Sequence, residues 1–259
     1  MKRTWVFLKR NLLEMIRDPL IYIFAMAFPI LMILLFFLIN HFTGGSTVQF
    51  EARNLLPGMV MFSYLFVMLL LSLLVSKDRT TSFLRRLYVS PMKNVEFLLG
   101  YLILGILIGI LQSILLLFFG FLLSVFTKEA YFSFLSSLLL VLSQLPILLF
   151  SLSMGIFIGS SLNDKAAPGI TSVFITLGGM LGGCYMPVDM MGDFEFFCRV
   201  LPFYPSVYIG RIVVGACHTE GNLYTFDSVA KYGLLTILLY LCLSFFLACF
   251  FFSRQRKRN

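Results

Sequence analysis

Charged residues are scarce in this chain, and that scarcity decides its class. Asp, Glu, Lys and Arg make up 12% of its 259 residues, against about 25% in soluble domains. A soluble protein of this length needs charged side chains to keep its surface hydrated. The composition therefore excludes an ordinary soluble protein, and the mean hydropathy of +0.95 is typical of a membrane protein.

Six long stretches contain no charged residue at all. They are Leu20–Asn40, Asn54–Ser76, Phe97–Thr127, Ala130–Asn163, Ala166–Val188 and Tyr232–Ser253. A helix rises about 1.5 Å per residue, so roughly 20 apolar residues cross a hydrocarbon core of about 30 Å. The shortest stretch has 21 residues. The sequence predicts an all-α membrane protein in which a single transmembrane domain of six helices fills residues 1–259, with no room for a soluble catalytic domain.

Several kinds of functional site are missing from the sequence. His41 and His218 are isolated and no CxxC motif occurs, so a metal site is not expected. The stretches hold no charge that marks an ion or proton pathway, which disfavours a channel or a proton-coupled transporter. No G-x-x-x-x-G-K-[ST] motif is present, so P-loop ATP binding is not expected in this chain. The sequence leaves open whether Cys184, Cys198 and Cys217, near the outer boundary, form a disulfide.

Lys and Arg are distributed unevenly over the predicted loops. Fifteen of the 20 fall on one side of the membrane, in the N-terminal segment, the loop after the second stretch, Lys165 and the tail. Because cytoplasmic loops carry the excess of positive charge, both termini are predicted to be cytoplasmic. These residues are scattered over four segments, so a nucleic-acid partner is not expected.

The N-terminal segment predicts an amphipathic helix. Apolar side chains gather on one face at 100° per residue, namely Trp5, Leu8, Leu12, Met15 and Ile16, with Arg3, Arg10, Glu14 and Arg17 opposite. Such a helix is typical of a segment in the headgroup plane, where it serves as an anchor or as a lever toward a cytoplasmic partner. We therefore divide the domain into an interfacial helix over 1–19, a six-span bundle over 20–253 and a basic tail over 254–259.

Polar residues inside the third and fourth stretches are expected to hydrogen-bond between helices rather than to contact cargo. They are Gln112, Ser113, Ser143, Gln144, Ser151 and Ser153. Pro146 is expected to kink the fourth span.

Two connecting segments have unusual patterns. The loop after the second stretch predicts a short helix over about 82–88, whose apolar side chains need to be covered by the base of the bundle or by another subunit. The outer segment between Met186 and Lys231 is cut by Pro187, Pro202 and Pro205 into pieces too short to cross the membrane. Short helices that dip in and return are expected there, before the last span.

These features in this order resemble the membrane subunit of type-2 ABC exporters, of the small bacterial drug- and antibiotic-export type. In the loop after the second stretch, Asp78, Leu87 and Pro91 match the family pattern, and Leu99-Gly100 follows. Ser82, Phe83 and Arg85 depart from the residues usual in the family. The second match runs through Gly183-Cys-Tyr-Met-Pro187, Leu201-Pro202-Phe-Tyr-Pro205, Tyr208 and Arg211.

The resemblance implies a permease subunit that exports a small amphipathic drug, antibiotic or peptide, as in multidrug resistance. A separate ATP-binding subunit would hold ATP and Mg, and two copies of each chain would form a multi-pass complex in a bacterial cell membrane. The contacts with that subunit would come from Asp78, Ser82, Phe83, Leu84, Arg85, Arg86, Leu87, Tyr88 and Pro91.

The resemblance also assigns a cargo path between the second and fifth spans. The candidate lining residues are Met61, Tyr64, Met68, Leu71, Thr171, Phe174, Gly178 and Leu181. The re-entrant segment would contain Pro187, Pro202, Pro205, Tyr208 and Arg211.

Two alternatives remain from the sequence. The cargo is alternatively a lipid-linked polysaccharide or a teichoic-acid precursor. In another class, the chain is a self-contained intramembrane enzyme, although Cys242 and Cys249 have no His or acid near them in sequence to activate a nucleophile.

Overall fold

The computed structural model describes residues 2–17, 23, 27–43, 48–80, 94–127, 133–186, 188, 191–218 and 221–258. Within these ranges the chain is helical, apart from short connections and an isolated bridge between Cys217 and Leu223. The elements are α1 (Lys2–Arg17), α3 (Phe28–Phe42), η2 (Val48–Phe50), α4 (Ala52–Thr80), α6 (Asn94–Thr127), α7 (Phe134–Ser143), α8 (Leu145–Ser161), α9 (Ala167–Leu181), α10 (Phe194–Val200), α11 (Phe203–Val214) and α12 (Ser228–Arg258).

Four helical stretches among the described residues are long and apolar enough to cross a membrane. They are α4, α6, the consecutive pair α7 and α8, and α12. The pair α10 and α11 meets at 89° and makes a fifth span if it is counted as one. By contrast, α3 and α9 have 15 residues each, which gives about 22 Å at about 1.5 Å per residue. The described helices thus give a polytopic all-α membrane protein with four or five candidate spans, and the number six stays a prediction.

The fifth predicted span is shorter than the sequence indicated because two glycines end it. Helix α9 stops at Leu181, whereas the apolar stretch continues to Val188. Gly182 forms the cap, and Gly183 has a φ of +69°, a left-handed conformation that glycine adopts without strain. Hydropathy alone therefore placed the end of this helix too late.

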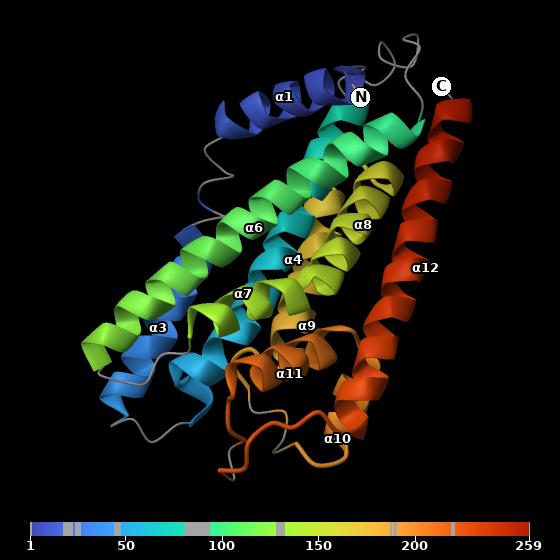
Figure 1. Cartoon of the computed structure of the whole chain (residues 1–259). Coiled ribbons are helices and arrows are strands. Elements are labelled where there is room, and N and C mark those ends of the chain that lie inside the picture. The colour runs from blue at the N-terminus through green and yellow to red at the C-terminus, as the bar shows by residue number, and fades with distance from the viewer. Residues whose placement is uncertain are drawn as a thin grey trace.

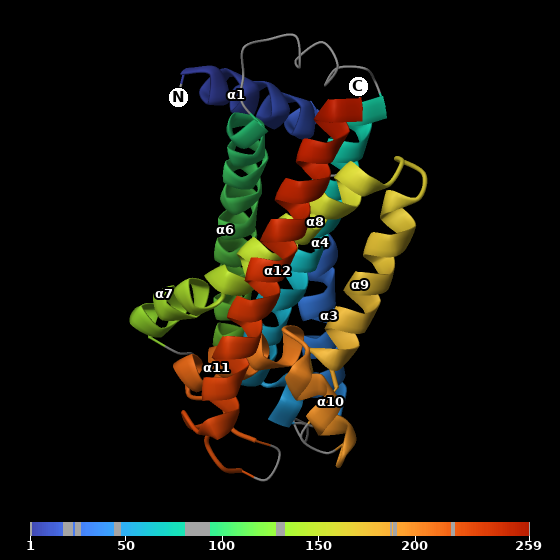
Figure 2. The same cartoon turned by 90° about the vertical axis from the view of Figure 1, so that its right-hand side faces the viewer.

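The long helices run along the bundle, and α1 lies across one end of it (Figures 1 and 2). The N-terminal helix and the C-terminal end of α12 are at this same end, while α10 and α11 are at the opposite end (Figure 2). We call the end with α1 the inner end and the end with α11 the outer end. The two chain ends thus lie at the same end of the bundle. A chain that crosses the membrane an even number of times has this arrangement.

Helix α4 is the centre of the bundle. In its apolar part 94% of the residues are buried, because α6, α8, α9 and α11 all pack around it. Helix α12 packs on α8 and is mostly exposed on its other faces. Apolar side chains exposed on α12, α6 and α9 are expected to face lipid or another chain, since lipid tails are as apolar as a protein core.

The fourth span is broken at Gln144, two residues before Pro146. Helix α7 ends at Ser143, and α8 begins at Leu145 with the proline in its first turn. The Gln144 side chain is fully buried and points to α11, where its Nε2 donates to the Ser206 carbonyl at 2.7 Å. The Ser206 hydroxyl donates in turn to Gln144 Oε1 at 2.5 Å. The helix-to-helix hydrogen bonding expected of this glutamine is thereby present.

Replacing Gln144 by leucine is expected to lower the free energy of unfolding by about 2 kcal/mol, because the buried Ser206 hydroxyl loses its acceptor. The measurement is the midpoint of thermal unfolding in detergent. Ser143→Ala is the control: the Ser143 hydroxyl donates only to Leu140 in its own helix, so the change is expected to cost no more than about 0.5 kcal/mol. Equal midpoints for Gln144→Leu and the unmodified chain would show that the hydrogen bonds between Gln144 and Ser206 do not stabilise the fold.

Helix α1 has a different buried face from the one its sequence predicted. Phe7, Leu8, Asn11 and Met15 are buried, whereas Trp5 is 67% exposed. Part of the predicted apolar face thus packs against the bundle, and the rest of it is exposed on the surface of the chain. The outward apolar part is what a helix in the headgroup plane needs, and that location remains a prediction.

Candidate functional site

A buried carboxylate ties three helices together at the inner end. Asp78, in the last turns of α4, is 1% exposed. Arg10 of α1 places its Nη1 2.9 Å from Asp78 Oδ1. Tyr101 of α6 donates its hydroxyl to Asp78 Oδ2 at 2.7 Å. A carboxylate removed from water needs partners for its oxygens. Asp78, Arg10 and Tyr101 therefore form one unit, which we call the inner unit.

Neighbouring contacts extend this unit along α1. Lys77 Nζ lies 3.2 Å from Glu14 Oε1, and Glu14 also pairs with Arg10 on its own helix. On the apolar side, the Phe7 ring meets the Tyr101 ring edge-on with centroids 5.1 Å apart. Gly100 makes this contact possible, since a Cβ there would lie 2.5 Å from the Phe7 ring. Helix α1 is therefore fixed to α4 and α6 by both charge and packing.

Most residues proposed to contact an ATP-binding subunit lie outside the described residues. Asp78 is described and is the centre of the inner unit. The others, in the connection between α4 and α6, are Ser82, Phe83, Leu84, Arg85, Arg86, Leu87, Tyr88 and Pro91. At the edge of this connection, Arg79 Nη1 donates to the Ser160 carbonyl of α8 at 2.7 Å. The inner end of α4 is thus held by α1, α6 and α8 together.

The candidate path residues on α4 are inside the chain rather than on its surface. Met61, Tyr64, Met68 and Leu71 are at most 1% exposed, and the Tyr64 hydroxyl lies 2.7 Å from the Ser113 hydroxyl of α6. These four side chains line no open path in this conformation.

The candidates on α9 lie at its contact with α4. The hydroxyls of Thr171 and Ser72 are 3.2 Å apart, and a Cβ on Gly178 would lie 2.5 Å from a methyl group of Leu65. Phe174 and Leu181 are half-buried. The two candidate sets therefore meet along one closed α4–α9 seam.

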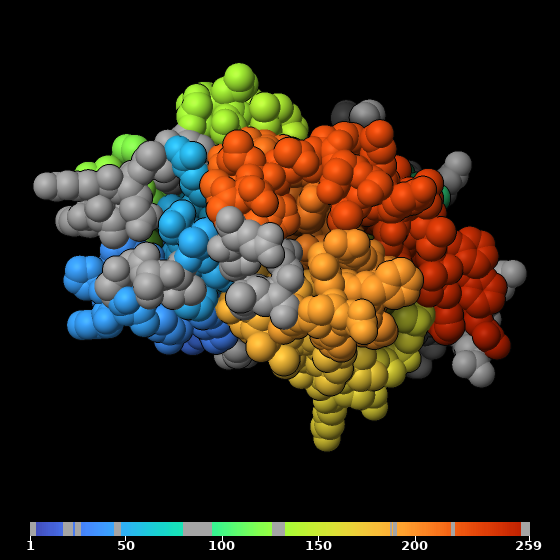
Figure 3. All heavy atoms as spheres, turned by 90° about the horizontal axis from the view of Figure 1, so that it is seen from below, coloured from blue at the N-terminus to red at the C-terminus, as the bar shows by residue number. Residues whose placement is uncertain are grey.

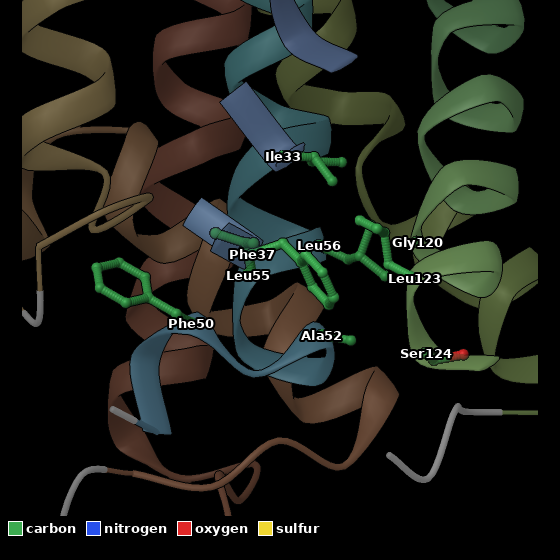
Figure 4. A pocket seen from close by; sticks show the side chains of 9 residues that line it. All are labelled: Ile33, Phe37, Phe50, Ala52, Leu55, Leu56, Gly120, Leu123 and Ser124. Atoms are coloured by element: carbon green, nitrogen blue, oxygen red, sulfur yellow. The ribbon is translucent and has the colours of Figure 1, made fainter. Parts of the chain in front are cut away.

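A small, partly open crevice of about 20 Å³ lies between α3, α4 and α6 (Figure 4), which is about enough for one water molecule. Its lining is apolar except for Ser124, whose hydroxyl donates to Phe121 in the same helix. A Cβ on Gly120 would lie 2.6 Å from a methyl group of Leu56, so the inner wall of the crevice is tightly packed. The crevice offers no polar group that would orient a cargo.

At the outer end, α11 is buried beneath the ends of the long helices. Pro202 caps α11, and Pro205 packs on α12, where a Cβ on Gly233 would lie 2.8 Å from the proline. The Tyr208 hydroxyl donates to Asp227 Oδ2 at 3.1 Å. Arg211 is fully buried and contacts α4, the turn after α9 and Tyr224. Pro187, the remaining residue of this predicted set, lies outside the described residues.

Sites for a metal or for nucleophilic catalysis do not emerge from the described part of the chain. No group of three or more His, Cys, Asp or Glu side chains comes together within it. Cys184, Cys198 and Cys217 are unpaired, so the outer cysteines form no disulfide in this structure.

The sequence model of the ABC-2 type transporter family matches residues 2–214. The chain belongs to this family. It is therefore a membrane component of an ABC transporter, a permease subunit that crosses the membrane several times. No match was found among the curated proteins or among the solved structures.

Sequence reasoning missed several partners in this ABC-2 permease. Tyr101 and Arg10 were not connected with Asp78, and Asn54 and Tyr224 were not connected with Arg211. The partners are far apart in sequence: Tyr101 follows Asp78 by 23 positions, and Arg211 follows Asn54 by 157. One signal was available, namely an Asp at the end of an apolar stretch, which requires a partner if the helix end is buried.

Proposed function

We propose that this chain is the permease subunit of an ATP-driven exporter in a bacterial cell membrane, working with a separate ATP-binding subunit that holds ATP and Mg. The observation that carries the proposal is the inner unit. It fixes α1 to the helix ends on both sides of the 81–93 connection, through Asp78, Arg10 and Tyr101. A force applied at this connection is passed to α4, the central helix of the bundle.

The distribution of charge supports the proposed orientation. The described cations Lys9, Arg17 and Lys77 are exposed at the inner end, where the positive-inside rule places the cytoplasm. Six crossings, with α3 and α9 each completing a span, would place both termini there. An ATP-binding subunit is cytoplasmic, so the inner end is also the side where it would dock.

Two copies of the chain would face each other through α9, whose outward side is apolar. Ile170, Val173, Leu177 and Met180 are each at least 41% exposed. Behind this face lies the α4–α9 seam with the candidate path residues. ATP binding would open the seam in another conformation, and its Met and aromatic side chains suit a small amphipathic drug, antibiotic or peptide because they adapt their shape.

The test of the proposed function is purification of the tagged chain in mild detergents, followed by mass spectrometry. The expected result is recovery of an ATPase with a P-loop, in the same molar amount as the tagged chain. Recovery of the chain without any ATPase in several detergents would contradict the proposal and favour a self-contained membrane protein.

Replacing Leu87 by aspartate is expected to reduce the recovered ATPase at least about tenfold, equivalent to about 1.4 kcal/mol of binding free energy. The reason is that a charge would enter the apolar part of the proposed contact. Leu223→Asp is the matched control, because Leu223 is 60% exposed at the opposite end. Unchanged ATPase recovery with Leu87→Asp would place the contact elsewhere.

A further inference from the structure

Arg211 is the largest fully buried side chain of the described residues. It belongs to α11, at the outer end of the bundle. A guanidinium removed from water needs partners for its charge and its donors. None of the ion pairs in the described part of the chain includes Arg211. Its charge is stabilised instead by neutral oxygen atoms.

These oxygens belong to three separate segments. Nη2 donates to the Gly183 carbonyl at 2.7 Å, in the turn after α9. Nε donates to the Asn54 carbonyl at 3.3 Å, in the first turn of α4. Nη1 donates to the Tyr224 hydroxyl at 3.2 Å, and the guanidinium carbon lies 5.5 Å from the centre of the Tyr224 ring. Figure 3 shows this end of the molecule, with the orange α11 region beside the light-blue start of α4.

The turn after α9 is pressed directly against α4 at this point. Gln49 Nε2 donates to the same Gly183 carbonyl at 2.9 Å. The Cys184 thiol donates to the Gly58 carbonyl at 3.2 Å. A Cβ on Gly58 would lie only 2.9 Å from the Cys184 Cα, so no space separates the two segments. The outer end of α4 is therefore in direct contact with the turn after α9. Arg211 donates hydrogen bonds to both segments.

We propose that Arg211 is a positioning residue that holds the outer ends of α4 and α9 together. It thereby keeps the outer end of the α4–α9 seam closed, and we call this end of the seam the outer mouth. The inference rests on the proposed export function, in which cargo leaves between these two helices. Separating them breaks a hydrogen bond from a buried cation to one carbonyl or the other. Such charge-assisted bonds are stronger than neutral ones, and an unpaired buried charge is costly, so the closed state is favoured until cargo or ATP opens it.

Lysine cannot replace arginine in this role. The planar guanidinium has donors that point in several fixed directions, which is why one side chain reaches Asn54, Gly183 and Tyr224 at once. The compact ammonium of lysine is a single point of charge on a flexible stem. Arg211→Lys therefore keeps the charge and loses the simultaneous contact with α4 and α9.

Cys184 is a natural reporter of the mouth, because it lies in the turn after α9 and is fully buried against α4. The full-length chain, with Cys198, Cys217, Cys242 and Cys249 replaced by alanine, is produced in intact cells together with its ATP-binding partner. A maleimide that does not cross membranes is added outside, and the rate of Cys184 labelling is measured. We expect slow labelling of this parent chain and a rate at least tenfold higher with Arg211→Lys.

A second variant keeps the inference testable if Arg211→Lys fails to fold. Tyr224→Phe removes one acceptor of Arg211 and keeps the ring, so a smaller increase of two- to fivefold is expected. Tyr232→Phe is the matched control: it also removes a hydroxyl at the outer end, but Tyr232 is 74% exposed, and no change is expected. Equal rates in the parent chain and Tyr224→Phe, or an equal increase with Tyr232→Phe, would overturn the inference.

The orientation is tested separately with Cys217 as the sole cysteine. This half-buried residue lies in the outer segment after α11. Labelling of Cys217 from outside agrees with the proposed orientation. If it is not labelled, the proposed orientation and export function fail. If it is labelled while the rate at Cys184 is the same with and without Arg211→Lys, the orientation stands and the inference about Arg211 fails.

Discussion

Gly159→Ala is expected to destabilise the bundle by at least about 3 kcal/mol, the upper end of what overpacking costs in a well-packed core. The glycine lies where α8 crosses α4. An added Cβ would meet the Ser72 carbonyl oxygen at 2.5 Å and the Val75 Cβ at 2.9 Å. Both atoms belong to or adjoin the α4 backbone, so the clash is relieved only by moving the two helices apart.

The same contact continues one turn away. A Cβ on Gly155 would lie 2.8 Å from the Met68 carbonyl oxygen, so Gly155 and Gly159 together let α8 approach the α4 backbone, as pairs of small residues four apart do in membrane helices. Separation of α4 and α8 would also disturb α6, α9 and α11, because α4 packs against all three.

The measurement is the midpoint of heat- or SDS-induced unfolding in detergent, read by size-exclusion chromatography. Gly169→Ala is the matched control, since nothing lies within 4 Å of a Cβ built on Gly169, at the start of α9. That control is expected to unfold at the same midpoint or slightly higher, because alanine favours helix by about 1 kcal/mol over glycine. If Gly159→Ala behaved like Gly169→Ala, the close α4–α8 approach would be wrong.

Arg10→Met is expected to lower the free energy of unfolding by about 3 kcal/mol, the low end for removing one partner of a buried ion pair. The cost arises at Asp78, which is 1% exposed and would keep only the Tyr101 hydroxyl. Arg10 itself is 34% exposed, and solvent screening of that side places the estimate at the low end. In the transporter, the loosened α1 is also expected to abolish the change in ATP turnover caused by cargo.

The controls separate the buried pair from the loss of a surface cation. Lys9→Met removes the exposed charge next to Arg10 and is expected to leave the midpoint unchanged. Arg10→Met combined with Asp78→Asn removes both charges and keeps an acceptor for Tyr101, so stability is expected to return to within about 1 kcal/mol. A double variant no more stable than Arg10→Met would show that the ion pair is not the source of the effect.

Local signals in the sequence located the breaks in the helices well. Pro146 correctly indicated an interruption of the fourth span, because a proline ring fits the first turn of a helix and clashes within one. Pro202 and Pro205 correctly indicated short helices at the outer end. These features depend on the backbone of a few adjacent residues, which the sequence specifies directly.

The faces of the helices were not predictable in the same way. Hydropathy did not indicate that Met61 and Met68, both candidates for a cargo path, would be fully buried at the centre of the chain in this conformation. Trp5 and Met15 were expected on one face of α1, and the structure exposes the first and buries the second. In a membrane protein the lipid side and the bundle side are equally apolar, so hydropathy does not distinguish them.

By itself, the sequence determined that this protein is helical, lies in the membrane and matches the ABC-2 family, because hydropathy and motif order are properties of the chain. Only the tertiary structure decided which distant residues share a site. Asp78 contacts Arg10 and Tyr101 because of the way the helices pack against one another. Arg211 donates to Asn54 and Gly183 for the same reason. Those positions depend on where small residues such as Gly159 let two backbones meet, which is a property of the whole bundle.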